Sequence, residues 1–182
     1  MPRHRLLGSL ALTFMTKMAS GYWHVFDPQN GFVACRAAML QRLELQQIAT
    51  DYFFENDMLV QLNVHGARVV DVPLPARYGD EVSSMRISRI LLTFPARLFF
   101  RYWWRIYQRY ALRDFSPVVL FLASGMLLCT WAVGFGSWSW FQSWQTGVVA
   151  TTGTVMLTAL PFILGFELLL HAVLLDIYFT PK

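Results

Sequence analysis

No Asp, Glu, Lys or Arg occurs between Asp114 and Glu167, and this uncharged run sets the main limit on how the chain folds. The run is too long for one helix of a globular core, and it is long enough for two membrane-spanning helices of about 20 residues each. Charged residues make up 14% of the sequence, against about 25% in ordinary soluble domains. The C-terminal part is therefore predicted to be a transmembrane hairpin.

The predicted hairpin has a recognisable start and a recognisable turn. Ser116 followed by Pro117 provides a helix N-cap and a first-turn proline. We expect the first span to run from Val118 to near Trp138 and the second to cover residues 148–170. The turn between them is expected near 134–137, where glycines and tryptophans gather as they do at a membrane interface.

Seven arginines and no acidic residue lie from Arg86 to Arg113, directly before the uncharged run. Arginines beside a transmembrane segment mark its cytoplasmic side and contact anionic lipid. Because the far turn carries no charge, we expect a multi-pass protein of the inner (cytoplasmic) membrane with both termini cytoplasmic. The same placement argues against nucleic acid as a partner, although the net charge is +4.

Residues 86–116 are predicted to form amphipathic helices at the membrane interface. Arginine recurs at every fourth position from Arg97 to Arg113, with Phe, Tyr and Trp between. Rings that carry polar groups, interleaved with cations, suit a helix that lies in the headgroup layer. Pro95 is expected to separate this helix from a shorter one over 85–92. The alternative is a charged helix that packs on the preceding residues.

The first 85 residues hold most of the acidic groups and the turn signals. The predicted elements are, in order, a turn over 27–31, a strand over 32–35, helices over 36–43 and 53–64, and a strand over 68–74. Gly66 is expected to stop the second helix, and Asn30-Gly31 to favour positive φ. So few elements bury too little apolar surface to fold well alone. We therefore expect a partial α/β lobe whose remaining strands lie elsewhere.

Taken singly, the polar residues of this part are typical turn, cap and surface groups. Glu55 and Asp57 lie in the first turn of a predicted helix, where acids stabilise the helix dipole. No Cys and His cluster has metal-ligand spacing, so no metal site is expected in this chain. In the second span, Glu167 and His171 lie four residues apart. They form either a functional pair inside the membrane or, as we favour, interfacial groups near the cytoplasmic exit.

Four segments carry motifs whose order is informative. Residues 20–32 contain an Asp-x-x-x-Gly-Phe turn, 52–59 an acidic residue before Met-Leu, 66–73 a Val-Pro strand end, and 76–83 an Arg-x-Gly loop. In this order they resemble the second half of a family 2 glycosyltransferase, of the dolichol-phosphate-mannose synthase-like or polyprenyl-phosphate group. The last loop departs from that family's pattern because it is longer and has no lysine. The family's nucleotide-binding half, with its Asp-x-Asp metal motif, has no counterpart here.

The resemblance implies a partial GT-A-like lobe and a role in moving a sugar from a nucleotide-sugar to a polyprenyl phosphate at the cytosolic face. The donor and a divalent metal, Mg or Mn, are expected only in the complete enzyme. This chain is expected to hold no cofactor and to be inactive alone. The implied acceptor and phosphate ligands are Arg77, Ser83 and Asn30, and the implied catalytic acids are Asp27, Asp57 and Glu55. The expected membrane-interface residues are Arg97, Arg101, Arg105, Trp103 and Trp104, and the three arginines among them are expected to draw the anionic lipid headgroup toward the site.

The sequence thus predicts a partial α/β lobe over 1–85, interfacial amphipathic helices over 86–116 and a transmembrane hairpin over 117–182. Small residues in the spans (Gly125, Gly153, Gly165) permit close helix packing and hence a homo-oligomer. The alternative function is a non-enzymatic two-span membrane module that binds anionic lipid or a partner protein.

Overall fold

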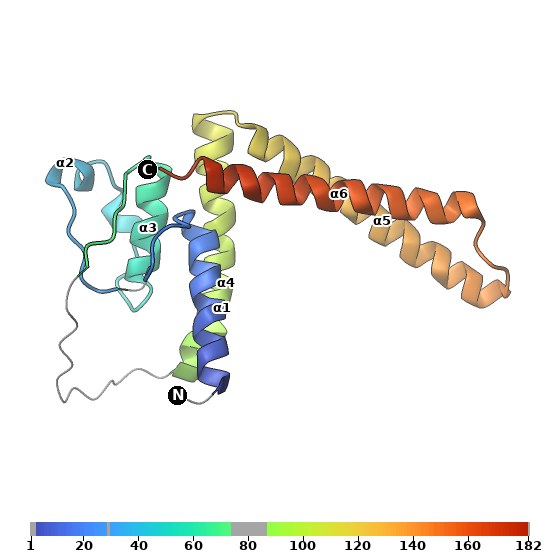
Figure 1. Ribbon diagram of the computed structural model, residues 1–182, viewed down its shortest axis with the longest axis horizontal. Helices are drawn as coiled ribbons and strands as arrows, with labels where there is room; N and C mark the ends of the chain where they lie inside the picture. Colours follow the sequence, from blue (N-terminus) through green and yellow to red (C-terminus); the bar gives the residue numbers. More distant parts are fainter. Residues whose placement is uncertain (1–2, 29, 74–86, 182) are drawn as a thin grey trace. The chain divides into compact units, whose positions relative to one another are not determined.

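The computed structural model describes residues 3–28, 30–73 and 87–181 (Figure 1). The chain divides into two compact units. We call Met1–Arg113 with Phe179–Lys182 the helical unit, and Asp114–Tyr178 the hairpin unit. The elements are, in order, α1 (Arg3–Ser20), α2 (Ala37–Leu40), a 3₁₀ turn (Leu45–Gln47), α3 (Phe54–Val64), α4 (Ile87–Ile106), a π-helical turn (Tyr107–Arg113), α5 (Pro117–Thr146) and α6 (Thr152–Tyr178).

The predicted α/β lobe is wrong, because every regular element among the described residues is helical and none is a strand. Residues 32–35 and 68–73 have no regular secondary structure and belong to no ladder, and residue 74 lies outside the described part. A strand exists only where a neighbouring strand accepts and donates its backbone hydrogen bonds. Runs of Val and Phe predict a preference for extended backbone, but they do not supply that neighbour.

Two non-helical segments of the helical unit, residues 22–26 and 67–71, nevertheless lie side by side. The Tyr22 hydroxyl donates to the Ala67 carbonyl at 2.5 Å, and a His24 ring nitrogen lies 2.8 Å from the Val69 carbonyl oxygen. The Phe26 N–H donates to Asp71 Oδ2 at 2.7 Å. Alternate residues of one segment thus meet alternate residues of the other, with a constant offset of 45 positions. Each of these three bonds uses at least one side chain, which is why the pairing is not a β ladder.

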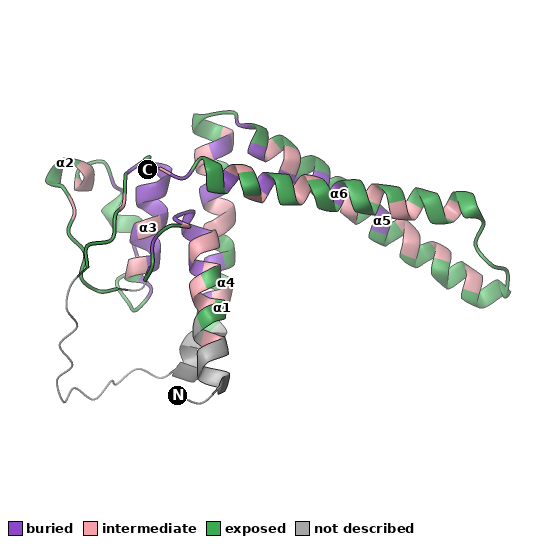
Figure 2. Cartoon of the chain, in the orientation of Figure 1, coloured by how far each residue is buried: buried purple, intermediate pink, exposed green. Residues whose placement is uncertain are grey.

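The core of the helical unit forms where α1 packs against α3 and α4. The inner face of α3 is buried almost throughout (Figure 2). One buried cluster joins α1, α3 and α4 and consists of Ala19, Phe53, Phe94 and Leu98. A second buried cluster consists of Tyr22, Val25, Leu43, Ile48, Met58, Leu62 and Ala67.

Helix α3 matches the predicted helix over 53–64 and its predicted stop. Gly66 has φ +67°, a left-handed conformation that costs glycine little. Its N–H donates to the Asn63 carbonyl, and the Ala67 N–H donates to the Leu62 carbonyl. This is the Schellman arrangement, which satisfies carbonyls left open at a helix end. At the 27–31 turn, by contrast, neither Asn30 nor Gly31 has positive φ.

Two other helix predictions need correction. The helix expected over 36–43 is a single turn, α2, because Leu43 is drawn instead into the buried cluster around Tyr22. Pro95 does not separate two helices but lies inside α4. A proline in a helix interior costs about 3 kcal/mol. Here its neighbours Phe94 and Leu98 are buried against Ala19 and Phe53, and this packing holds the helix together.

The hairpin unit consists of α5 and α6, and both helices are long and apolar enough to cross a membrane. The predicted N-cap is confirmed, because the Ser116 hydroxyl accepts a hydrogen bond from the Val118 N–H. The turn expected at 134–137 is wrong, since these residues continue α5. Each glycine costs a helix only about 1 kcal/mol, and the two here, Gly134 and Gly136, do not end it. The helix ends instead at Gly147, which has φ +67°.

Small residues bring α5 and α6 close together. A Cβ on Gly125 would lie 2.8 Å from the Gly165 carbonyl oxygen, and a Cβ on Gly165 would lie 2.8 Å from Cys129 Sγ. Neither position has room for a methyl group. Two of the three glycines that the sequence suggested for helix packing are therefore used within the hairpin itself.

Candidate functional site

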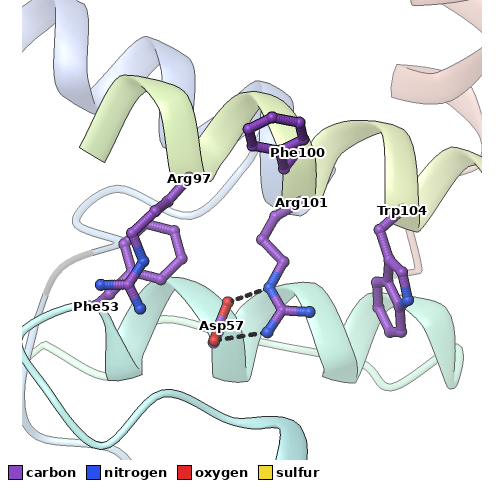
Figure 3. A pocket seen from close by; sticks show the side chains of 6 residues that line it. All are labelled: Phe53, Asp57, Arg97, Phe100, Arg101 and Trp104. Atoms are coloured by element: carbon purple, nitrogen blue, oxygen red, sulfur yellow. Dashed lines mark hydrogen bonds and ion pairs between the residues drawn. The ribbon is translucent and has the colours of Figure 1, made fainter. Parts of the chain in front are cut away.

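A pocket of about 320 Å³ lies between α3 and α4 in the helical unit (Figure 3). Helix α4 supplies two arginines and two aromatic rings, and α3 with the residue before it supplies an acid and a third ring. The lining residues are Phe53, Asp57, Arg97, Phe100, Arg101 and Trp104. Two of the predicted interface arginines and one predicted catalytic acid thus meet in one place.

Asp57 is the buried anchor of this pocket, with 2% of its surface exposed. Its Oδ1 lies 2.6 Å from Arg101 Nε, and its Oδ2 accepts from Arg101 Nη2 at 2.9 Å (Figure 3). The same Oδ2 accepts from the Ala49 N–H at 2.9 Å. Arg101 Nη2 also donates to the Gln47 carbonyl. A carboxylate held this way is a counter-ion for Arg101, with little access for a substrate.

Arg97 forms the outer ion pair of the pocket. Its Nη1 lies 2.6 Å from Asp51 Oδ2, and both side chains are well exposed, 37% for Arg97 and 58% for Asp51. The hydrogen bond from Arg97 lowers the pKa of the Asp51 carboxyl below its usual value. The Arg97 guanidinium also lies 4.2 Å from the centre of the Phe53 ring, within the range of a cation–π contact.

The outer rim of the pocket is aromatic. Phe100 is 71% exposed and its neighbour Phe99 is 56% exposed. Trp103 and Trp104, two predicted interface residues, are half-buried. The Arg101 guanidinium lies 5.4 Å from the Trp104 ring, and the Phe99 and Trp103 rings meet edge to face. Exposed apolar rings beside a cation are the groups that enter a lipid headgroup layer.

The next arginines of the row turn inward. Arg105 is fully buried, and its guanidinium donates to the carbonyls of Ala19 and Met18 at 2.8 and 3.0 Å. It thereby caps the C-terminal end of α1, where free carbonyls attract a cation. Local spacing does not indicate this role of Arg105, because the carbonyls it binds lie more than eighty positions earlier in the chain.

Arg109 and Arg113 also bond within the helical unit. Arg109 donates to Asn63 and to the carbonyl of Phe179, and Arg113 lies 3.2 Å from a ring nitrogen of His65. The arginine row therefore contacts the helical unit, whereas Phe99 and Phe100 of α4 are exposed. A four-residue step turns about 400°, so the row drifts around the helix, and spacing alone did not indicate these inward contacts.

The remaining predicted site residues lie apart from this pocket. Asp27 and Asn30 are exposed on the 27–31 turn, where the Asn30 N–H donates to the Asp27 carbonyl. Glu55 is half-buried, and a Cβ on Gly31 would lie 3.9 Å from its Oε1, so Glu55 adjoins that turn. Arg77 and Ser83 lie outside the described residues.

The helical unit also has a polar interior that sequence reasoning missed. Thr16 of α1 donates to Asn56 of α3 at 3.0 Å, and both side chains are buried. Asn63 is fully buried beside Arg109. In the part of the chain that the structure describes, no group of three His, Cys, Asp or Glu is placed to hold a metal ion.

The fold and the pocket together define a helical protein with two helices suited to crossing a membrane and a pair of ion-paired arginines at an aromatic surface. Comparison with known protein families, with curated proteins and with solved structures gave no match to this chain.

Proposed function

We propose that this chain is the acceptor-side, membrane-anchoring part of a glycosyltransferase that moves a sugar from a nucleotide-sugar to a polyprenyl phosphate. The proposal is supported by the order of the four motifs that resemble family 2 glycosyltransferases, and by the apolar hairpin that follows them. The sequence has no Asp-x-Asp motif. Donor and metal are therefore expected to bind outside these residues.

One structural observation carries the proposal further than the motifs do. Helix α3, which holds Glu55 and Asp57, is fixed to α4 by the Asp57–Arg101 ion pair. Helix α4 leads through residues 107–116 into α5. The phosphate of a polyprenyl lipid lies at the bilayer surface, so an acceptor site has to be held there. Attachment of the acid-bearing helix to the helix that precedes the membrane span meets this requirement.

The geometry assigns different tasks to the two arginines of the pocket. Arg101 is held by a buried carboxylate, so it is a structural residue. The Arg97–Asp51 pair is exposed, and exposed ion pairs contribute little free energy. A lipid phosphate can replace Asp51 on Arg97 at small cost, because guanidinium pairs well with phosphate oxygens. In this proposal Arg97 attracts the headgroup, Arg77 binds the phosphate, and Asp27 orients it.

The reaction demands more from positioning than from proton removal. A phosphate acceptor is already largely ionised near neutral pH, so a general base adds little. Asp57 therefore acts as a positioning residue for Arg101 in this scheme, and the exposed Asp27, with Glu55 beside its turn, faces the acceptor.

The proposed location is the inner (cytoplasmic) membrane, with both termini on the cytosolic side. Phe179, just after the hairpin, accepts a hydrogen bond from Arg109, just before it, and both residues belong to the helical unit. Both ends of the hairpin therefore return to one unit, which requires an even number of crossings. The seven arginines before the hairpin favour the cytosolic side for that unit.

The test is binding of the full chain, in lipid nanodiscs, to a long-chain polyprenyl phosphate compared with the matching polyprenol. We expect a clear preference for the phosphate, and about a tenfold loss of affinity in Arg97→Gln, which corresponds to about 1.4 kcal/mol. Arg42→Gln, on an exposed residue outside the pocket, is the matched control and should bind normally. Equal binding of polyprenol and polyprenyl phosphate would contradict the proposal, as would sugar transfer by the isolated chain.

A second candidate is a non-enzymatic module that binds anionic lipid of any kind. The exposed Phe99 and Phe100 beside Arg97 favour it, because they suit a membrane surface whatever the headgroup. Nanodiscs that contain phosphatidylglycerol but no polyprenyl phosphate, added as competitors, distinguish the two candidate functions. Equal competition by phosphatidylglycerol supports the module, and selective binding of polyprenyl phosphate supports the transferase.

A further inference from the structure

A carboxylic acid lies on the outward face of α6. Helix α6 contacts α5 through Gly165 and is buried again at Ala172, one heptad later. Glu167 follows Gly165 by two residues and therefore points about 200° away around the helix. It is exposed, and so are Ile163 and Leu170 on the same side, at 59% and 50%. Figure 2 shows this helix largely exposed along its length.

The position of Glu167 along α6 places it inside the hydrocarbon layer when the hairpin spans a bilayer, deeper than the interfacial position that the sequence favoured. The helix has 27 residues, so it is about 40 Å long, and the hydrocarbon layer is about 30 Å thick. Glu167 precedes the last residue, Tyr178, by eleven positions, or about 16 Å. A helix centred in the layer therefore holds Glu167 about 11 Å below the surface, deeper than a glutamate side chain reaches. An acidic side chain there is costly unless it is paired.

His171 lies one turn further along α6, at the edge of this face, where its ring also meets Phe121 of α5 with 6.2 Å between ring centroids. It offers a complementary group. Its Nδ1 lies 2.9 Å from the Glu167 backbone carbonyl oxygen. A carbonyl oxygen only accepts, so Nδ1–H is the donor, and Nε2 of the neutral ring is left as an acceptor. The ring is exposed. The Glu167 carboxyl has no hydrogen bond or ion pair with any residue in the described part of the chain.

We infer that this face of α6 binds a second copy of the chain through reciprocal Glu167–His171 hydrogen bonds. A two-fold axis along the membrane normal places the two α6 helices parallel, so that Glu167 of each copy meets His171 of the other. Either position of the proton gives one donor and one acceptor, as a carboxylic acid with a neutral imidazole or as a carboxylate with an imidazolium. The exposed Ile163 and Leu170 pack around the two bonds.

A second copy fits this face better than an unrelated partner because the two complementary groups are present on one chain. A symmetric contact uses each of them twice and leaves neither group unpaired. The inference depends on insertion of the hairpin into the membrane. It does not depend on the glycosyltransferase activity.

The experiment is disulfide cross-linking in native membranes. In a background of Cys35→Ser and Cys129→Ala, Leu170→Cys places a thiol beside the proposed two-fold contact. Leu127→Cys places one on an α5 surface that is 72% exposed and serves as the matched control. We expect a cross-linked dimer from Leu170→Cys and at least tenfold less from Leu127→Cys.

Two further substitutions test the polar contact itself. Combined with Leu170→Cys, Glu167→Leu should reduce the cross-linked dimer at least tenfold, whereas Glu167→Gln should retain it because its amide still donates to Nε2. Equal cross-linking of the α5 control, or unchanged cross-linking in Glu167→Leu, overturns the inference.

Resistance to carbonate extraction, measured on each variant, separates this inference from the membrane proposal. If the chain resists extraction but Leu170→Cys gives no cross-linked dimer, only the dimer inference is overturned. If carbonate extracts the chain, both the dimer inference and the membrane proposal are overturned.

Discussion

Asp57 and Arg101 meet at two points, with 2.6 Å between Oδ1 and Nε and 2.9 Å between Oδ2 and Nη2, although Asp57 is only 2% exposed. Asp51, just before α3, and Arg97, one turn earlier on α4, form a second pair through a single contact of 2.6 Å, with both side chains exposed. Two aspartate–arginine pairs thus join neighbouring parts of the same segments, and they differ in burial and in the number of contacts. Burial decides the free energy, because removing one partner strands a charge only where water cannot reach it.

Asp57→Asn should therefore lower the free energy of unfolding by about 3 kcal/mol, since it leaves Arg101 without its counter-ion. Asp51→Asn is the matched control and should cost less than about 1 kcal/mol. Chemical unfolding of the detergent-solubilised chain, followed by circular dichroism, measures both. If the two variants lose equal stability, burial does not determine the free energy that these ion pairs contribute. The double variant Asp57→Leu with Arg101→Met should lose less than the sum of its single variants.

Gly21→Ala should destabilise the helical unit more than Gly66→Ala does, although φ is nearly the same at both positions, +72° and +67°. The left-handed backbone costs alanine about 1 kcal/mol at either position. At Gly21 the new Cβ would also lie 2.6 Å from the Arg105 guanidinium, which is buried and bonded to Ala19 and Met18. At Gly66 nothing lies within 4 Å.

We expect a total loss near 3 kcal/mol for Gly21→Ala and near 1 kcal/mol for Gly66→Ala. The same unfolding measurement checks both variants. Arg105→Lys in the Gly21→Ala background should recover part of the loss, because the ammonium group is smaller. Equal losses for the two glycines would show that the guanidinium moves aside at little cost.

Signals carried by residues that are close together in the chain explain what could be predicted from the sequence. The Ser116 cap, the end of α3 at Gly66 and the two apolar helices each depend on residues close together in the chain, so spacing and composition were sufficient. The strand predictions were wrong because a strand needs a partner strand far along the chain. The predicted turn at 134–137 and the predicted break at Pro95 were wrong because the helix-disfavouring residues there, two glycines and one proline, are outweighed by the residues around them.

The pocket was predictable in parts but not as a whole. Its arginines and aromatic rings stand out in the sequence, and Asp57 stands out within α3. What joins them is the packing of α3 against α4, which brings together residues more than forty positions apart. The inward direction of Arg105 depends in the same way on the end of α1. Spacing places such residues on one side of a helix, but it does not identify what that side contacts.

Tyr22 should make the helical unit sensitive to alkaline pH. Burial raises the pKa of its phenol above the ordinary value, so the folded state favours the neutral, hydrogen-bonded form. The resulting stability is fully present below about pH 10, the unfolded pKa, and is lost as the pH rises beyond it.

Tyr22→Phe should cost about 1 kcal/mol at neutral pH, through loss of the bond to the Ala67 carbonyl, and should weaken the alkaline loss. Melting temperatures between about pH 8 and about pH 11 measure this dependence, and the exposed Tyr52→Phe is the control. An alkaline loss of the same size in Tyr22→Phe would place its origin in another group.

Gly165→Ala and Gly134→Ala should change the stability of the hairpin in opposite directions. At Gly165 the new Cβ would lie 2.9 Å from the Cys129 backbone nitrogen and 2.9 Å from the Gly125 carbonyl oxygen. Backbone atoms cannot move aside singly, so α5 and α6 must separate, at a cost of about 1–3 kcal/mol. At Gly134 nothing lies within 4 Å, and alanine should stabilise α5 by up to about 1 kcal/mol through its higher helix propensity.

Thermal unfolding in detergent, with maleimide labelling of Cys129 as a second readout, should show a lower melting temperature and faster labelling for Gly165→Ala alone. Faster labelling in both variants would mean that the glycine contact does not hold the two helices together.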